Sequence, residues 1–145
     1  MLADLNTLFQ RDLQRLIDDL EAYPTDASVW TLQGDIKNSA GTLALHLVGN
    51  LNHYFGARLG NTGYVRHRDA EFSTRDVPRA ELIQRLRDTM AMLERVFALP
   101  LDLATTYPEE VLGYSMTTQF FLCHLYGHLN WHRGQVNYHR RLVAG

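Results

Sequence analysis

The stretch that most constrains the fold is Thr117–Val143, near the end of the chain, which contains no proline. Its apolar residues recur at the spacing of one helix face. They are Phe121, Leu122, Leu125, Leu129 and Val136. The sequence therefore predicts one long amphipathic helix here, beginning near Ser115 or Thr117.

Three further segments show the same helical periodicity. The first is Leu2–Ala22, which ends before Pro24 because a residue that precedes proline is pushed out of the α region. The second runs from Ser39, which offers an N-cap oxygen, to about Leu59. The third opens at Asp76-Val77-Pro78, with proline in the first turn, and ends at Leu99-Pro100. Four amphipathic helices predict an all-α fold, a four-helix bundle, as a single domain over 1–145.

The connections between these helices have no clear period. Trp30 and Leu32 suggest a short extended piece, as does Glu110–Gly113. Gly60–Asp76 is longer than most connections in a compact domain, so we interpret it either as a functional lid or as a long crossover.

Composition narrows the classes of function. Hydrophobic residues make up 46% of the chain and charged residues 21%, as in ordinary globular proteins. The net charge is −2 with no basic block, so we expect no nucleic-acid partner. No apolar run reaches the length that crosses a bilayer, so we expect no membrane partner and a cytoplasmic location. Cys123 is the only cysteine, which excludes an internal disulfide, and we expect it to be a small core residue.

Three histidines follow one another along a single face of the predicted last helix. His124, His128 and His132 are each four residues apart, and such residues are neighbours on a helix surface. Histidine is the commonest metal ligand, and two of them one turn apart can bind one ion. His46, on the buried-looking face of the second helix, is the best candidate for a third ligand. The alternative is that these histidines are core or interface residues that form only hydrogen bonds.

Two motifs resemble the DinB superfamily of small metal-binding four-helix proteins. His128–Gln135 resembles the HxxxH-x-G-Q signature on its last helix, and Ser39–Asn50 its second helix with a ligand histidine. Arg68–Phe72 is similar to a run in an uncharacterised branch of the superfamily. The resemblance covers nearly the whole chain and implies a metal site formed by His46, His128 and His132. Three histidines leave at least one coordination position for another ligand.

Three other polar residues are candidates to support the metal ligands or to contact a substrate. Gln135 could orient His132, because metal-bound imidazoles usually donate their second N–H group to a partner. Asn50, one turn after His46, is a similar candidate. His124 is expected beside the ligands or deeper in the bundle, because three histidines at successive four-residue steps of one helix do not converge on one ion. For each of them, plain packing is an equally good interpretation.

The remaining histidines and the charged loop are expected to have structural roles or to face solvent. His53 lies too far along its helix from His46 to share its metal, and we expect His67 and His139 to be solvated. The arginines of Arg66–Glu71 could receive an acidic substrate, but we favour pairing with Asp69 and Glu71, the commoner outcome.

The expected function is that of a metal-dependent enzyme acting on a small-molecule substrate. The resemblance implies either transfer that uses a low-molecular-weight thiol as cosubstrate or metal-assisted hydrolysis. Zinc, nickel, iron and manganese all accept imidazole ligands, so the metal stays open. The alternative is a non-catalytic metal- or ligand-binding stress-response module. The resemblance and the aromatic residues of the last helix favour a homodimer.

Overall fold

The computed structural model describes residues 1–144, and all repeating backbone structure in them is helical. In chain order the elements are α1 (Leu2–Glu21), the 3-10 helix η1 (Ala27–Trp30), α2 (Ala40–Leu51), the π-helix η2 (Asn52–Ala57), α3 (Arg68–Ser73), α4 (Arg79–Phe97) and α5 (Thr118–Ala144). The predicted all-α class is confirmed.

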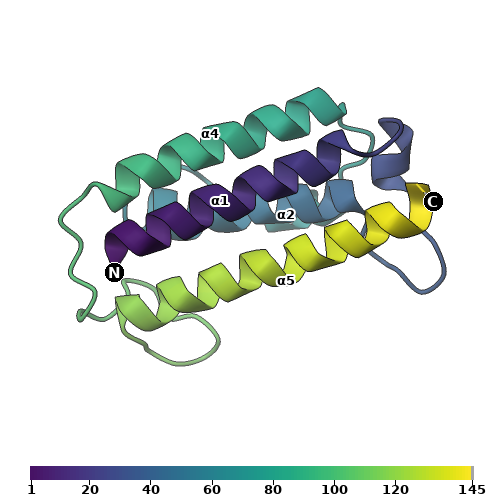
Figure 1. Cartoon of the computed structure of the whole chain (residues 1–145). Coiled ribbons are helices and arrows are strands. Elements are labelled where there is room, and N and C mark those ends of the chain that lie inside the picture. The colour runs from purple at the N-terminus through teal and green to yellow at the C-terminus, as the bar shows by residue number, and fades with distance from the viewer. Residues whose placement is uncertain (145) are drawn as a thin grey trace.

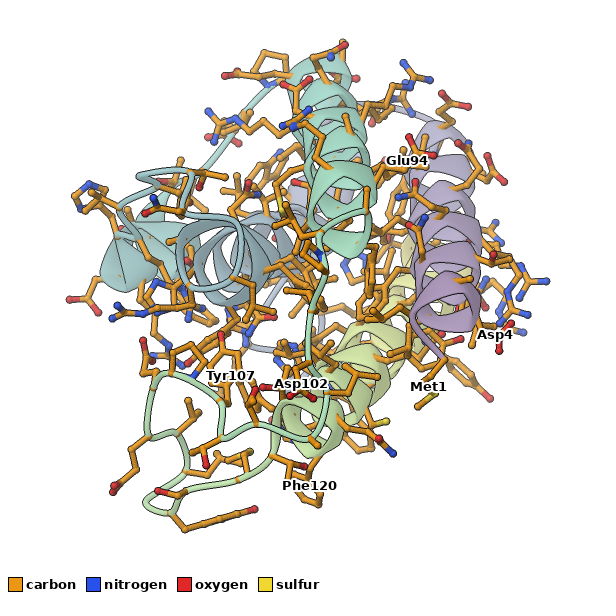
Figure 2. The ribbon with its side chains drawn as sticks, turned by 90° about the vertical axis from the view of Figure 1, so that its left-hand side faces the viewer. Met1, Asp4, Glu94, Asp102, Tyr107 and Phe120 are labelled. Atoms are coloured by element: carbon orange, nitrogen blue, oxygen red, sulfur yellow. The ribbon has the colours of Figure 1, made fainter. Side chains whose placement is uncertain are left out.

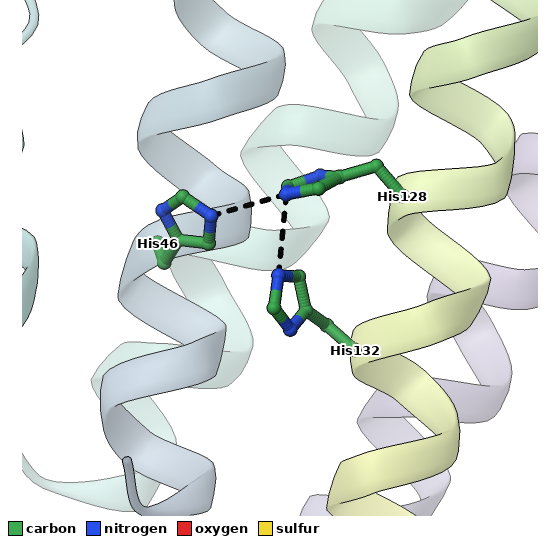
Figure 3. A group of neighbouring side chains, drawn as sticks. All are labelled: His46, His128 and His132. Carbon is green, nitrogen blue, oxygen red and sulfur yellow. Dashed lines mark hydrogen bonds between the residues drawn. The ribbon is translucent and has the colours of Figure 1, made fainter. Parts of the chain in front are cut away.

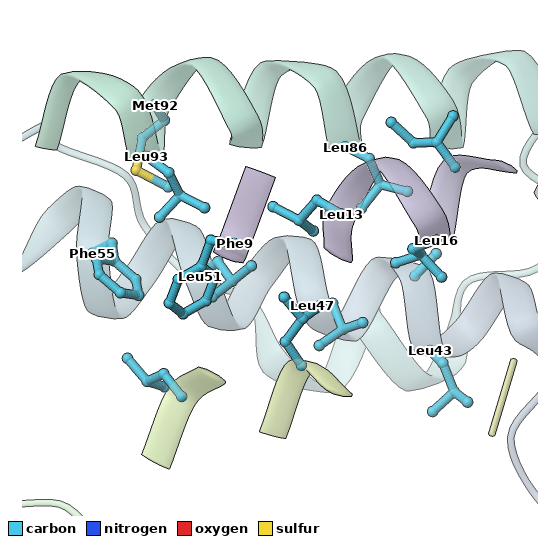
Figure 4. Packing of buried hydrophobic residues seen from close by; sticks show 14 of the residues in the cluster. Phe9, Leu13, Leu16, Leu43, Leu47, Leu51, Phe55, Leu86, Met92 and Leu93 are labelled. Atoms are coloured by element: carbon cyan, nitrogen blue, oxygen red, sulfur yellow. The ribbon is translucent and has the colours of Figure 1, made fainter. Parts of the chain in front are cut away.

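Four long helices lie side by side along most of the length of the molecule (Figure 1). α1 packs against α4 and α5, α2 packs against the same two helices, and the short α3 packs on α2. The core lies where the apolar faces of α1, α2, α4 and α5 meet (Figure 4). Its largest fully buried side chains include Phe9, Leu13, Leu47, Leu51 and Leu86.

The second predicted helix begins as expected but does not remain α-helical. The Ser39 side chain accepts a hydrogen bond from the backbone N–H of Thr42, which confirms the N-cap. After Leu51 the chain widens into η2, where Arg58 N–H donates to the carbonyl of His53, five residues back. π-Helical turns are rare and are often found near functional sites.

The predicted extended piece at Trp30 and Leu32 is wrong, because Trp30 ends η1. Its indole N–H donates to the carbonyl of Val77 over 3.2 Å. The indole also lies so close to Gly41 that a Cβ there would come within 2.6 Å of the ring. A glycine at the start of α2 therefore lets this tryptophan tie η1 to the connection before α4.

The connection from α4 to α5 closes one end of the molecule. Figure 2 shows this connection from that end. Asp102 and Tyr107 lie near the first turn of α5, which contains Phe120. The buried Tyr107 hydroxyl donates to the backbone carbonyl of Tyr54 in η2. In place of the predicted extended piece at Glu110–Gly113 there is only an isolated bridge between Val111 and Tyr114.

Two further features of the chain bear on the expectations from sequence. Cys123 is exposed on α5, so its prediction as a core residue is wrong. Among residues 1–144, none of the helices combines the length and the apolar character that crossing a membrane requires. The long connection predicted at Gly60–Asp76 contains α3, and its position against α2 matters for the site below.

Candidate metal centre

Three imidazoles from two helices meet between α2 and α5 (Figure 3). Nε2 of His128 lies 3.2 Å from Nε2 of His46 and 3.2 Å from Nε2 of His132. One ring nitrogen from each residue lies within 4.8 Å of those of the other two. The three histidines that the sequence singled out therefore lie close enough together to hold a metal ion.

The hydrogen bonds of two of these rings fix which nitrogen faces the centre. Nδ1 of His46 donates to Oε1 of Glu71 over 3.0 Å, and Nδ1 of His132 donates to Oε1 of Gln135 over 2.7 Å. In a neutral imidazole the other nitrogen then carries a lone pair. Nε2 of both rings therefore presents a lone pair to His128, and the predicted contact between Gln135 and His132 is confirmed.

The ring of His128 cannot donate a hydrogen bond to both His46 and His132. Its Nε2 carries one proton at most, so it can donate to one facing lone pair but not fully to both. Its Nδ1 is buried and forms no hydrogen bond with the described residues. Three nitrogens on one tetrahedral zinc ion, at the usual ~2.0–2.1 Å, would lie ~3.3–3.4 Å from one another. The two separations of 3.2 Å are close to this value, and all three nitrogens lie within 4.8 Å of one another, which places their lone pairs within reach of one ion.

The surroundings keep the rings of His128 and His132 neutral, as metal binding requires. Burial, reinforced by the neighbouring His132 and His46, lowers the pKa of His128 to about 3. Burial also lowers the pKa of His132, although its hydrogen bond with Gln135 opposes the shift. Neither imidazole is protonated to the charged imidazolium form at neutral pH, so each can offer a nitrogen lone pair.

Glu71 supports His46 from the opposite side, and sequence reasoning did not assign it this role. Arg66 holds the same carboxylate through two hydrogen bonds, from Nε to Oε2 over 2.8 Å and from Nη2 to Oε1 over 3.0 Å. Burial alone would raise the pKa of Glu71, but the hydrogen bonds from His46 and Arg66 outweigh it and lower the pKa. The carboxylate is therefore ionised. The predicted pairing of the loop arginines is confirmed for Arg66 with Glu71, but among the described residues neither Arg68 nor Asp69 forms an ion pair.

The carboxylate reaches His46 only because Gly49 has no side chain. A Cβ at Gly49 would lie 1.8 Å from Oε2 of Glu71. Glu71 belongs to the run Arg68–Phe72, but nothing in the spacing of that run indicates that α3 packs on α2 at this glycine. A glycine one turn after a candidate ligand is the one signal in the sequence that could have suggested such a close approach.

A pocket of about 200 Å³ opens beside His46 and His128. Asn50, Arg68 and His124 also line it. Asn50 is only 6% exposed, and its Oδ1 has no hydrogen-bond partner among the described residues. His124 is exposed and lies in this pocket, outside the triad. The centre thus borders a small space lined by polar side chains.

His53 and His67 lie away from the centre. Nε2 of His53 lies 3.0 Å from Oε1 of Glu109, which also accepts a hydrogen bond from Arg58. His67 is exposed, as predicted. Both histidines are therefore accounted for without a metal.

His139 was predicted to be solvated, and this is wrong. It is buried, with Nδ1 2.6 Å from the hydroxyl of Tyr23 and Nε2 2.7 Å from the carbonyl of Thr31. The ring bridges α5 to the segment that follows α1. It therefore has a structural role that its position beyond the motif did not reveal.

Comparison of the chain with protein-family models, with curated proteins and with solved structures finds no match. The functional interpretation of the site therefore rests on its geometry and chemistry.

Proposed function

We propose that the protein is a metal-dependent enzyme in which His46, His128 and His132 hold one divalent ion. The observation that carries the proposal is the convergence of three Nε2 atoms, two of which must present lone pairs to the third. Protons on three neutral rings cannot satisfy this arrangement, whereas one cation can. Glu71 and Gln135 bind the outer nitrogens of two rings, as partners of metal-bound histidines usually do.

Such an ion supplies Lewis acidity, which lowers the pKa of a coordinated water or thiol enough to form a nucleophile at neutral pH. None of the described residues that line the pocket is a carboxylate, and Glu71 is committed to His46 and Arg66. A free thiol has a pKa of ~8.5, far below that of water, so a bound ion would convert it to the thiolate with less need of a separate base. We therefore favour thiol-dependent transfer to an electrophilic small molecule, with a low-molecular-weight thiol as cosubstrate.

Metal-assisted hydrolysis is the second candidate, and one residue favours it. His124 lies in the same pocket with its ring stacked 5.8 Å from that of Phe121, where it could accept a proton from water. A His124→Gln variant separates the two chemistries. It should abolish hydrolysis but leave thiol-dependent transfer largely intact.

We also propose that the chain is a DinB-like protein. The support is the resemblance of its motifs together with the meeting of His46 from α2 with His128 and His132 from α5 in an all-α chain. Zinc, nickel, iron and manganese all suit three imidazoles, so each belongs in the tests.

The direct test is metal content after purification without a histidine tag. We expect about one equivalent of divalent metal per chain in the wild type and less than about a tenth of that in His128→Ala, because the central ligand is lost. His124→Ala is the matched control, since it removes a histidine from the same helix and should retain the metal. Equal metal in wild type and His128→Ala, or none in either after incubation with all four metals, would refute the site.

Turnover decides between an enzyme and a binding module. The metal-loaded protein is assayed with a panel of electrophiles and several low-molecular-weight thiols, and with ester and amide substrates. Thiol-dependent turnover that disappears in His128→Ala supports the transferase. A fully loaded protein that turns over nothing would favour a non-catalytic metal- or ligand-binding module.

A further inference from the structure

The two arginines before and at the start of α3 have different surroundings. The Arg66 side chain is 11% exposed and both of its hydrogen bonds go to Glu71. Arg68 is exposed, and its guanidinium lies 5.1 Å from the centre of the Phe72 ring. That ring in turn lies 4.9 Å from the ring of His46. Arg66 is therefore a structural residue, whereas Arg68 lines the pocket with its charge available.

The pocket has a surplus of positive charge. Apart from Tyr54, its ionisable lining residues are all basic: His46, Arg66, Arg68, His124 and His128. The carboxylate of Glu71 touches the triad from outside and is balanced by Arg66. Three neutral imidazoles do not reduce the charge of a divalent ion. A ligand that enters this space therefore meets the ion and Arg68 with no carboxylate in the lining to offset them.

Asn50 provides a second, independent indication of a ligand. It is more than nine-tenths buried, yet its Oδ1 has no partner among residues 1–144. A buried polar atom without a hydrogen-bond partner destabilises the folded protein by about 1–3 kcal/mol, so such an atom usually has a partner in the functional state. The side chain lies one turn after His46 on α2 and lines the same pocket.

We propose that the pocket binds a small carboxylate-bearing molecule. Arg68 pairs with the carboxylate, and Oδ1 of Asn50 accepts a hydrogen bond from a donor group in the part of the molecule beside the histidine triad. A single available guanidinium matches a single carboxylate. The volume of about 200 Å³ limits the ligand to a small molecule or to one end of a larger one. This inference rests on the proposed function, because it places the ligand against the metal ion.

The test uses two thiols of nearly identical shape, 3-mercaptopropionate and its neutral amide, 3-mercaptopropionamide. Each is titrated into the Co²⁺-loaded protein, and binding is followed through the cobalt absorption spectrum. We expect the carboxylate to bind about tenfold more tightly than the amide in the wild type. In Arg68→Gln this ratio should fall to nearly one, with the affinity for the amide unchanged.

Two further variants make the result specific. Arg95→Gln removes the same charge from an exposed position on α4 outside the pocket and should keep the wild-type ratio. Asn50→Ala should keep the wild-type ratio, because Oδ1 of Asn50 accepts hydrogen bonds and does not contact the remote charge.

The outcomes distinguish failure of the carboxylate-binding inference from failure of the proposed metal-dependent function. Equal affinity for the two thiols in the wild type, or an unchanged ratio in Arg68→Gln, overturns the inference while the bound cobalt leaves the metal site standing. A protein that binds no Co²⁺ refutes the proposed function and the inference with it. Retained preference in Arg95→Gln with loss in Arg68→Gln supports the proposal.

Discussion

The carboxylate of Glu71 accepts a hydrogen bond of 3.0 Å from Nδ1 of His46, a residue 25 positions earlier in the chain. Arg66 binds the same carboxylate through two further hydrogen bonds. The segment between η2 and α4 therefore fixes the orientation of a ring that α2 provides. The connection Gly60–Asp76, which the sequence suggested to be a lid or a crossover, therefore helps to hold the site.

The variant Glu71→Gln should weaken metal binding by about 10- to 100-fold, the usual effect of losing a carboxylate behind a histidine ligand. The amide still fits the space but loses the negative charge that His46 and Arg66 share. Competition with a chromophoric chelator measures the affinity. Asp69→Asn is the matched control, since Asp69 is exposed on the same short helix. Equal losses in the two variants would contradict a specific role for Glu71.

The variant Gly49→Ala should disturb the same support from the other side. Its new Cβ would lie 1.8 Å from Oε2 of Glu71, so the carboxylate or α3 must move. Overpacking of this kind costs about 1–3 kcal/mol, and metal affinity should fall as well. Denaturant unfolding measures the free energy of unfolding.

Gly127→Ala is the control of opposite sign. Nothing lies within 4 Å of a Cβ at this exposed position on α5, so higher helix propensity should stabilise the protein by up to about 1 kcal/mol. A Gly49→Ala protein as stable as wild type, with normal metal affinity, would show that Glu71 does not press against α2.

The sequence was most informative about features that depend on the residue pattern of a single helix. Apolar periodicity and the Ser39 N-cap predicted the long helices, and the spacing of His128 and His132 predicted that their rings are neighbours. His46 could be joined to them only through a resemblance, because helical spacing carries no information on contacts between helices. Glu71 could not be found, since its position depends on how α3 packs against α2.

The errors have the same origin. His139 lies beyond the motif and looked solvated, but Tyr23 and the carbonyl of Thr31 cover it from a segment more than 100 residues away. Cys123 looked like a small core residue, but it lies on an outer face of α5. The burial of His139 depends on partners that the local pattern does not specify, and the exposure of Cys123 depends on which face of α5 packs against the other helices.

Acid sensitivity should depend on Asp12, which is fully buried on α1. Burial alone would raise its pKa, but hydrogen bonds from Arg11, Tyr126 and Asn130 outweigh burial and lower the pKa to about 2. The folded pKa lies below the unfolded value of ~3.9, so this stabilisation is complete above about pH 4 and is lost as the pH falls towards 2. Its size is about 2 kcal/mol at neutral pH.

Urea unfolding at several pH values tests this expectation. Asp12→Asn should be less stable at pH 7 and should lose less stability than wild type between pH 4 and pH 2. Asp4→Asn, at an exposed position on the same helix, should follow the wild-type curve. An Asp12→Asn protein with the wild-type pH profile would show that other carboxylates govern acid unfolding.

Metal should also raise the thermal stability of the protein, because the triad joins α2 to α5 and exists only in the folded state. Binding to the native state alone adds about 2.7 kcal/mol when the free metal is at 100 times its Kd. For a chain of this size that corresponds to a rise in Tm of about 5–10 °C, which a chelator should reverse. His132→Ala should show little of this rise, whereas His67→Ala, at an exposed position outside the centre, should show all of it. An equal rise in both variants would mean that the stabilising ion binds somewhere other than between these two helices.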